Sequence, residues 1–134
     1  MYMYGLTLFC IFRYFKFEPT PVSQASALTS CLMQGGTLAE PRTQQQFNAI
    51  RGFSSFSNQF WVGGRDPLEN GNWAFFSNDD PVPLGQFFRA TEPNNSGFNE
   101  FCLEFLIDGL NDQTCANQRP YLCEFGARGN AQVC

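Results

Sequence analysis

Six cysteines are the feature that most limits how this chain of 134 residues can fold. They are an even set, and no two of them form the Cys-x-x-Cys pair that metal clusters use. Separated cysteines in even number indicate disulfide bonds, which form and persist in oxidising compartments. The sequence therefore predicts a secreted, extracellular protein whose core is cross-linked.

The length is that of one domain, so we expect a single domain over residues 1–134. An apolar share of 43% and 16 phenylalanines provide enough material for a packed core. The first 12 residues are mostly apolar, but they lack the basic start and the cleavage site of a signal peptide and are too short to cross a bilayer. We expect residues 6–17 to form one strand or two joined segments.

Charge and composition exclude several classes of function. The net charge is −4, with a single lysine and no run of arginines, so neither nucleic acid nor an anionic membrane surface is an expected partner. The chain has no histidine and thus lacks the commonest acid–base catalyst. We therefore expect a binding protein without membrane insertion, and not an enzyme.

Five side chains with hard oxygen donors lie within a short stretch near the C-terminal third of the chain. They are Glu92, Asn94, Glu100, Asn111 and Asp112. A calcium ion requires six to eight such oxygens. A carboxylate can also accept a hydrogen bond from a sugar hydroxyl, and the NH2 group of a neighbouring amide can donate one to the hydroxyl oxygen. The set predicts a calcium site that also holds the hydroxyls of a sugar.

The proline between Glu92 and Asn94 has its own consequences. An X-Pro bond adopts the cis form at little cost, and we expect a cis Glu92–Pro93 bond that turns both side chains toward one point. Asn94-Asn95-Ser96 is also a glycosylation sequon, and a glycan on Asn94 would abolish the site. We expect Asn94 to be unmodified.

At these residues the chain resembles the C-type lectin-like family. The family's first-helix signature is matched by Ala27-x-x-x-Cys31-x-x-x-Gly35-Gly36-x-Leu38-Ala39, its central strand by Trp61-Val62-Gly63-Gly64, and its closing strand by Tyr121-Leu122-Cys123-Glu124. The resemblance covers roughly residues 14–125, the expected core of the domain. It implies an α+β fold with two short helices, two small antiparallel β-sheets and a long calcium-binding loop, stabilised by disulfides.

The resemblance also implies function. All five positions of the family's principal calcium and sugar site are kept, at Glu92, Asn94, Glu100, Asn111 and Asp112. The order Glu-Pro-Asn goes in that family with mannose-type sugars such as mannose, GlcNAc and fucose, whereas Gln-Pro-Asp goes with galactose. The expected cofactor is therefore Ca2+, and the expected partners are glycans with terminal mannose-type sugars.

The same resemblance assigns the disulfides Cys31–Cys123 and Cys102–Cys115. Cys10 and Cys134 remain, just outside the first and last strands. We expect them to pair with each other within the chain. The alternative is bonding between chains, which would make a homo-oligomer.

Several positions depart from the family. Its usual tryptophans are replaced by Gln24, Phe88 and Leu110, which we expect to affect packing and not coordination. The auxiliary calcium site keeps Asp66, but its other acidic positions have become Asn70, Asn95 and Phe101. We therefore expect one bound calcium; because Glu69 lies nearby, a second, weakly bound calcium is the alternative.

Local signals predict two short helices as the whole helical content. One covers residues 23–34 and ends at Gly35-Gly36; the other starts at a Thr43/Gln46 capping box. We expect Trp61 and Trp73 in the core and the phenylalanines of residues 53–60 packed inward. We expect Arg89 and Arg119 at the surface; the alternative is that they pair with acids around the site.

Two other classes of function stay open. A structural or protein-binding domain without sugar binding would agree with the lost tryptophans and the Asn94 sequon. A glycosidase could use Glu92 and Glu100 as its acid pair, but the sequence provides nothing to raise the pKa of such an acid.

Overall fold

The computed structural model describes residues 2–6 and 11–128 of the chain. Its strands are β1 (Tyr2–Leu6), β2 (Ile11–Val22), β3 (Thr37–Leu38), β4 (Gln59–Arg65), β5 (Cys102–Leu106), β6 (Gly109–Gln113) and β7 (Arg119–Arg128). Its helices are α1 (Gln24–Met33), α2 (Gln44–Arg51) and α3 (Leu84–Phe87), with 3-10 turns at Gly52–Ser55 and Ser96–Phe98. The architecture is α+β, as the sequence predicted.

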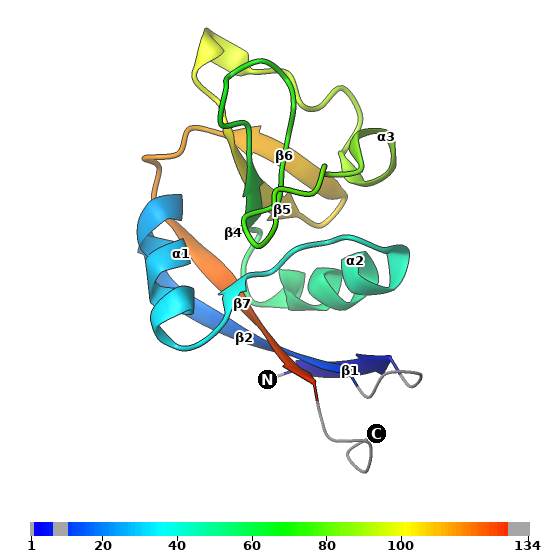
Figure 1. Cartoon of the computed structure of the whole chain (residues 1–134). Coiled ribbons are helices and arrows are strands. Elements are labelled where there is room, and N and C mark those ends of the chain that lie inside the picture. The colour runs from blue at the N-terminus through cyan, green and yellow to red at the C-terminus, as the bar shows by residue number, and fades with distance from the viewer. Residues whose placement is uncertain (1, 7–10, 129–134) are drawn as a thin grey trace.

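The strands form one mixed sheet in the order β1-β2-β7-β4-β5-β6, and β3 pairs with β7. Neighbouring strands are antiparallel except β4 and β7, which are parallel and pair at Trp61 and Tyr121. The two antiparallel groups expected from the sequence are present, but this parallel contact joins them into a single sheet. Figure 1 shows β1, β2 and β7 in the lower half of the molecule and β4, β5 and β6 in the upper half, below the long loop.

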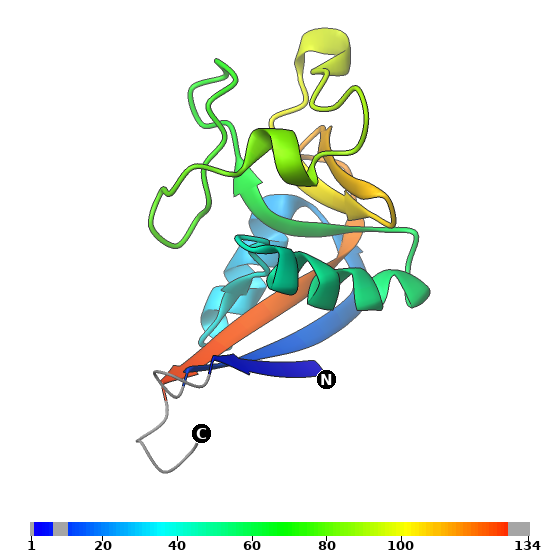
Figure 2. The same cartoon turned by 90° about the vertical axis from the view of Figure 1, so that its right-hand side faces the viewer.

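Helices α1 and α2 lie on opposite sides of β7 (Figures 1 and 2). Helix α1 begins at Ser23, whose side chain accepts a hydrogen bond from the Ser26 amide, and it is followed by Gly35 at a φ of 91°. Because residues with a side chain rarely adopt that φ, glycine is suited to the end of this helix. Helix α2 begins with the predicted capping box between Thr43 and Gln46, with both of its hydrogen bonds present.

The prediction of only two helices is incomplete. Helix α3 forms one further turn inside the loop between β4 and β5, and its Phe87 ring stacks on Phe47 of α2 with centroids 4.9 Å apart. The turn depends on this burial because four residues are too few to hold a helix by backbone hydrogen bonds alone.

Aromatic rings fill the core beneath the long loop. The rings of Phe60 and Phe105 stack 5.4 Å apart, and Phe47 lies 5.0 Å from Phe105. Trp61 is fully buried and its indole donates to the Val22 carbonyl at 2.8 Å, while Trp73 is 4% exposed. Both tryptophans therefore belong to the core, as expected.

One aromatic prediction is wrong in part. Phe53 is buried, but Phe56 is 65% exposed, although its ring lies beside that of Phe53 with centroids 5.8 Å apart. Phe56 nevertheless keeps contact with Phe17, at 5.4 Å between centroids.

The residues that stand in place of the family's tryptophans contribute to packing, as expected. Leu110 is fully buried, and Phe88 meets the edge of Trp73 at 6.0 Å. Gln24 is 2% exposed and its amide donates to the carbonyls of Val62 (3.0 Å) and Gly64 (2.9 Å), where the pairing of β4 with β5 shifts register. A buried polar group needs such partners.

Two disulfides lie within the described residues, Cys31–Cys123 and Cys102–Cys115, as the resemblance implied. The first joins α1 to β7, and the second joins the start of β5 to the segment after β6. The predicted pairing of Cys10 with Cys134 lies outside the described residues.

Candidate functional site

The five predicted site residues come from three neighbouring parts of the upper half. Glu92 and Asn94 lie on the loop after α3, Glu100 precedes β5, and Asn111 and Asp112 lie on β6. The β5–β6 hairpin places Asp112 opposite Leu103, and the Cys102–Cys115 disulfide closes the same end of the hairpin. The disulfide thus holds Glu100 close to β6. The Glu92–Pro93 bond is cis, as predicted.

Asp112 is the centre of the arrangement. Its side chain is fully buried. Its Oδ1 accepts a hydrogen bond from the main-chain N–H of Asn94 at 3.1 Å, and its Oδ2 accepts one from the main-chain N–H of Asn95. Hydrogen bonds to an ionised carboxylate are stronger than neutral ones. Asp112 therefore ties the loop carrying Glu92 and Asn94 to the edge of the sheet.

A second set of hydrogen bonds joins Asn94 to Glu100. The Ser96 amide donates to Oδ1 of Asn94 at 3.1 Å and to Oε1 of Glu100 at 3.0 Å. The Glu100 amide in turn donates to Oδ1 of Asn95 at 2.9 Å. Four of the five predicted residues are thus related through this loop, since Glu92 precedes the cis proline at its start.

The pKa values of two site carboxylates are raised, and the charge of Arg89 offsets only part of this effect at Glu92. Oε1 of Glu92 is buried and has no hydrogen-bond partner among the described residues. Burial, followed by the charges of Asp112 and Glu100, raises the pKa of Glu92. Burial also raises the pKa of Glu100, against a hydrogen bond from Ser96 that lowers it and the charge of Asp112 that raises it further. A bound cation would reverse these effects.

The fifth residue, Asn111, is held from behind the site. Its Nδ2 donates at 2.8 Å to Oε2 of Glu104, which is 1% exposed. Arg119 donates from Nε to the other oxygen of Glu104 at 3.1 Å, and Gln113 donates to Oε2 at 3.2 Å. Because the amide nitrogen of Asn111 is engaged, its Oδ1 is the atom left to bind an ion.

This supporting network was missed from the sequence. Arg119 was expected at the surface, but its side chain is only 20% exposed and pairs with buried Glu104. The available signal was Glu104 itself, an acid within an otherwise apolar run at residues 102–105, since a buried charge needs a partner. Arg89 does lie near the surface, where it pairs with the exposed Asp108 at 3.1 Å.

The residues fit a calcium ion by donor chemistry. Over residues 2–6 and 11–128, no three acidic, histidine or cysteine side chains gather closely enough to hold a metal by themselves. Amide oxygens from Asn94 and Asn111 are therefore needed to complete a ligand set. Calcium accepts such mixed sets of carboxylate and amide oxygens.

Asp66, which the resemblance assigned to the auxiliary calcium site, accepts hydrogen bonds from main-chain amides in this structure. It is 5% exposed, and its oxygens accept from the amides of Asn70 (3.1 Å) and Gly71 (2.7 Å). Its carboxylate thus closes the turn after β4. The expectation of a single calcium stays a prediction.

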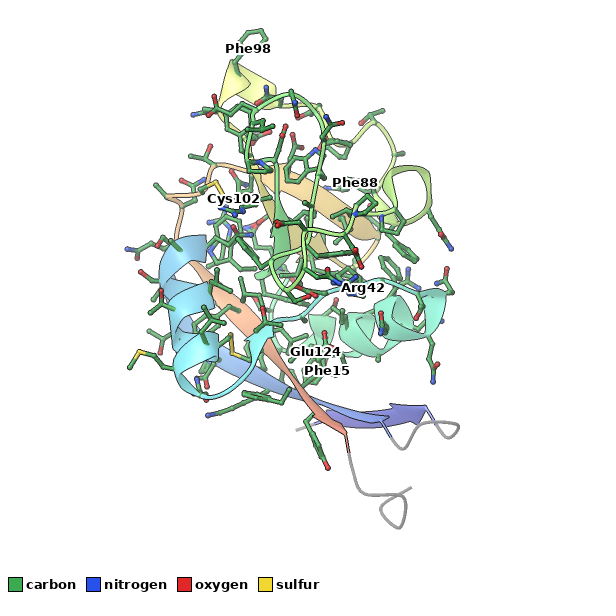
Figure 3. The ribbon with its side chains drawn as sticks, viewed as in Figure 1. Phe15, Arg42, Phe88, Phe98, Cys102 and Glu124 are labelled. Carbon is green, nitrogen blue, oxygen red and sulfur yellow. A yellow bond between two sulfur atoms is a disulfide. The ribbon has the colours of Figure 1, made fainter. Side chains whose placement is uncertain are left out.

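Figure 3 shows the upper loop with Phe98 at its tip and Cys102 lower down, where the loop meets the sheet. Within the part of the chain that the structure describes, no helix is both long and apolar enough to cross a membrane.

Known proteins share both sequence and fold with this chain. Residues 20–125 match the family model described as "Lectin C-type domain". Human CD209 antigen is 31% identical over 103 residues, which are 75% of this chain and 25% of that protein. Collectin-10 of Xenopus tropicalis is 33% identical over 101 residues, which are 74% of this chain and 37% of that protein. The matched segment is thus well under half of either relative.

Three solved structures illustrate the shared fold. The carbohydrate-recognition domain of the mouse scavenger receptor C-type lectin has a TM-score of 0.76, with 19% identity and 96% of both chains covered. SPL-1 in complex with GlcNAc has a TM-score of 0.71 at 19% identity, covering 84% of this chain and 86% of that one. A calcium-independent type II antifreeze protein also has a TM-score of 0.71, at 22% identity and with 84% and 85% covered.

Proposed function

Since this chain belongs to the C-type lectin domain family, a family of binding domains and not of enzymes, we propose that it binds carbohydrate through a calcium ion. Its fold is the C-type lectin-like fold predicted from the sequence. We propose a single domain over residues 1–134 with its core at about residues 14–125, and Glu92, Asn94, Glu100, Asn111 and Asp112 as ligands of both ion and sugar.

One observation carries the proposal: the buried Oε1 of Glu92 has no hydrogen-bond partner among the described residues, and the charges of Asp112 and Glu100 raise the pKa of Glu92 further. A buried carboxylate oxygen without a donor is unfavourable in any protein. A cation at this point would satisfy Glu92 and lower the pKa values of Glu92 and Glu100 together.

The side chains would divide the recognition of a sugar between them. Bound calcium would supply vacant coordination positions for two vicinal hydroxyls. Glu92 and Glu100 would accept hydrogen bonds from the hydroxyl groups, and the side-chain nitrogen of Asn94 would donate one to a hydroxyl oxygen. The order Glu92-Pro93-Asn94 supports mannose-type sugars, with equatorial hydroxyls of the mannose, GlcNAc or fucose class.

Context follows from the same family. Disulfide-bonded lectin domains are typical of extracellular or membrane-anchored proteins, and we propose secretion for this chain. Because one shallow site binds weakly, several copies acting together would strengthen attachment to a glycan surface. Pairing of Cys10 or Cys134 between chains is one way to assemble such copies.

The experiment is retention on mannose-agarose in calcium and release by a chelator. Glu92→Gln should lose retention, because the substitution removes the carboxylate at the centre of the argument. Glu18→Gln provides the matched control, since Glu18 lies on β2, away from the site, and pairs with Lys16. Equal retention of wild type with and without chelator would exclude the proposal.

A structural or protein-binding role is the second candidate. The observation that favours it is the exposure of Asn94 within its sequon, because an exposed asparagine is accessible to the glycosylation machinery. Mass spectrometry of the peptide containing Asn94, from protein secreted by eukaryotic cells, distinguishes the two. A glycan on Asn94 would favour this second role.

A further inference from the structure

Phe98 is the most exposed large hydrophobic side chain in the described part of the protein, at 87%. It stands at the tip of the loop between Asn94 and Glu100, and Figure 3 shows its ring directed away from the body of the molecule. Single exposed apolar residues are common on protein surfaces, so exposure alone carries no conclusion. The position of Phe98 is what distinguishes it.

The backbone at Phe98 adds a second observation. Its φ is +61°, directly after Gly97 at +72°. Bulky residues rarely adopt this conformation, which glycine or asparagine accepts readily. Packing does not explain the phenylalanine, because the side chain is almost wholly in solvent. The fold therefore holds an aromatic ring in an unfavourable conformation with no gain inside the chain.

The loop also fixes where the ring stands. The Phe98 main-chain N–H donates to the Asn95 carbonyl at 2.8 Å. The main-chain N–H of Ser96 donates hydrogen bonds to the side chains of Asn94 and Glu100. Phe98 and Glu100 are two positions apart in the chain, which limits the distance between their Cα atoms to about 7 Å. The ring is therefore carried by the same short segment that carries the proposed ligands.

A pyranose ring has polar hydroxyl edges and an apolar C–H face. In the proposed site the hydroxyl edge of one sugar is engaged by polar groups. Aromatic rings offer a large apolar surface at little loss of side-chain freedom, which suits them for the C–H face of a sugar.

We propose that Phe98 forms an apolar subsite for the second sugar of an oligosaccharide, the ring linked to the one held at the calcium. The inference rests on the proposed function and adds to it that the preferred ligand is an oligosaccharide. Phe98 is then a specificity-determining residue that contributes nothing to the capture of a monosaccharide.

The test is calorimetric titration, in calcium, of wild type, Phe98→Ala and Phe98→Trp with methyl α-mannoside and with the methyl glycosides of the α1→2, α1→3 and α1→6 mannobioses. Wild type should bind at least one disaccharide roughly three- to tenfold more tightly than the monosaccharide. Phe98→Ala should lose this preference while its affinity for methyl α-mannoside stays unchanged, and Phe98→Trp should keep it. Comparing the same ligands between variants cancels the twofold statistical advantage of a ligand with two mannose rings.

Met33→Ala is the matched control, because Met33 is 83% exposed but lies on α1, away from the site. An unchanged preference in Phe98→Ala would overturn the inference, and self-association of wild type that disappears in this variant would assign the ring to contacts between copies. Calcium-dependent binding of methyl α-mannoside by wild type shows the proposed function separately, and its absence would overturn the function and this inference together.

Discussion

Replacing Arg119 by methionine should destabilise the protein substantially, because it leaves Glu104 buried without its cation. Glu104 is 1% exposed and accepts three hydrogen bonds, from Asn111, Gln113 and Arg119. Removing one partner of a buried ion pair costs about 3–5 kcal/mol. Two donors to Glu104 remain in the variant, and the Arg119 side chain is 20% exposed, so we expect about 2–3 kcal/mol.

Arg89→Met is the matched control. Arg89 pairs with Asp108 at the same distance of 3.1 Å, but the two side chains are 37% and 56% exposed. Exposed ion pairs contribute at most about 1 kcal/mol, and many contribute nothing measurable. The same substitution at these two arginines therefore compares a buried pair with an exposed one.

The assay is urea unfolding followed by circular dichroism, with the disulfides intact and a chelator present so that calcium does not contribute. The double variant Glu104→Gln/Arg119→Met should recover most of the lost stability, because it removes the buried charge together with its partner. In calcium, Arg119→Met should also bind the ion more weakly, since Glu104 orients Asn111. If Arg119→Met and Arg89→Met lose the same small amount, the argument from burial is refuted.

Three further outcomes are expected. In the absence of calcium, the raised pKa values of Glu92 and Glu100 mean that the folded protein binds protons more tightly than the unfolded chain does. The contribution of these two residues to stability should therefore increase as pH falls from about 7 toward about 5. In the presence of calcium the pH dependence should reverse, because protons compete with the ion for the carboxylates. Replacing Cys102 and Cys115 together by alanine should lower the free energy of unfolding by about 3 kcal/mol, for a loop of 13 residues, and should weaken calcium binding as well. Gln24→Leu should lose about 2–3 kcal/mol, because two backbone carbonyls of β4 lose their buried donor.

Each of these outcomes has its own check. Unfolding of Glu92→Gln across the same pH range should show a weaker dependence, and an equal slope would contradict the assignment of the effect to this residue. Calcium titration of the double cysteine variant tests whether the disulfide positions Glu100, and unchanged affinity would show that it does not. A Gln24→Leu protein as stable as wild type would mean that water replaces the amide.

The predictable parts of the fold are those with local causes. The capping box at Thr43 and the exit at Gly35 depend on a few neighbouring residues, and both were predicted from the sequence. The disulfide pairing came from resemblance to a family, because spacing alone leaves several pairings open. The parallel contact between Trp61 and Tyr121 joins strands that are far apart in the chain, so no local pattern indicated it.

At the candidate site, the sequence predicted the residues but not how they are supported. The set of acids and amides could be read from their types and order. The pairing of Glu104 with Arg119 was not predicted, because the apolar neighbours of Glu104 indicate a buried charge but not which cation pairs with it. Helix α3 was missed for a similar reason, since its turn depends on Phe87 packing against another helix.

Asp112 accepts hydrogen bonds from two main-chain amides, so mutations at different residues of the site should have different consequences. A mutation at Glu92 removes a donor oxygen and leaves the loop tied to β6. A mutation at Asp112 releases the loop itself, so folding and ligand capture decline in one step. If relatives of this protein lose the proposed site, residue 92 should therefore change early and the aspartate should be retained longest.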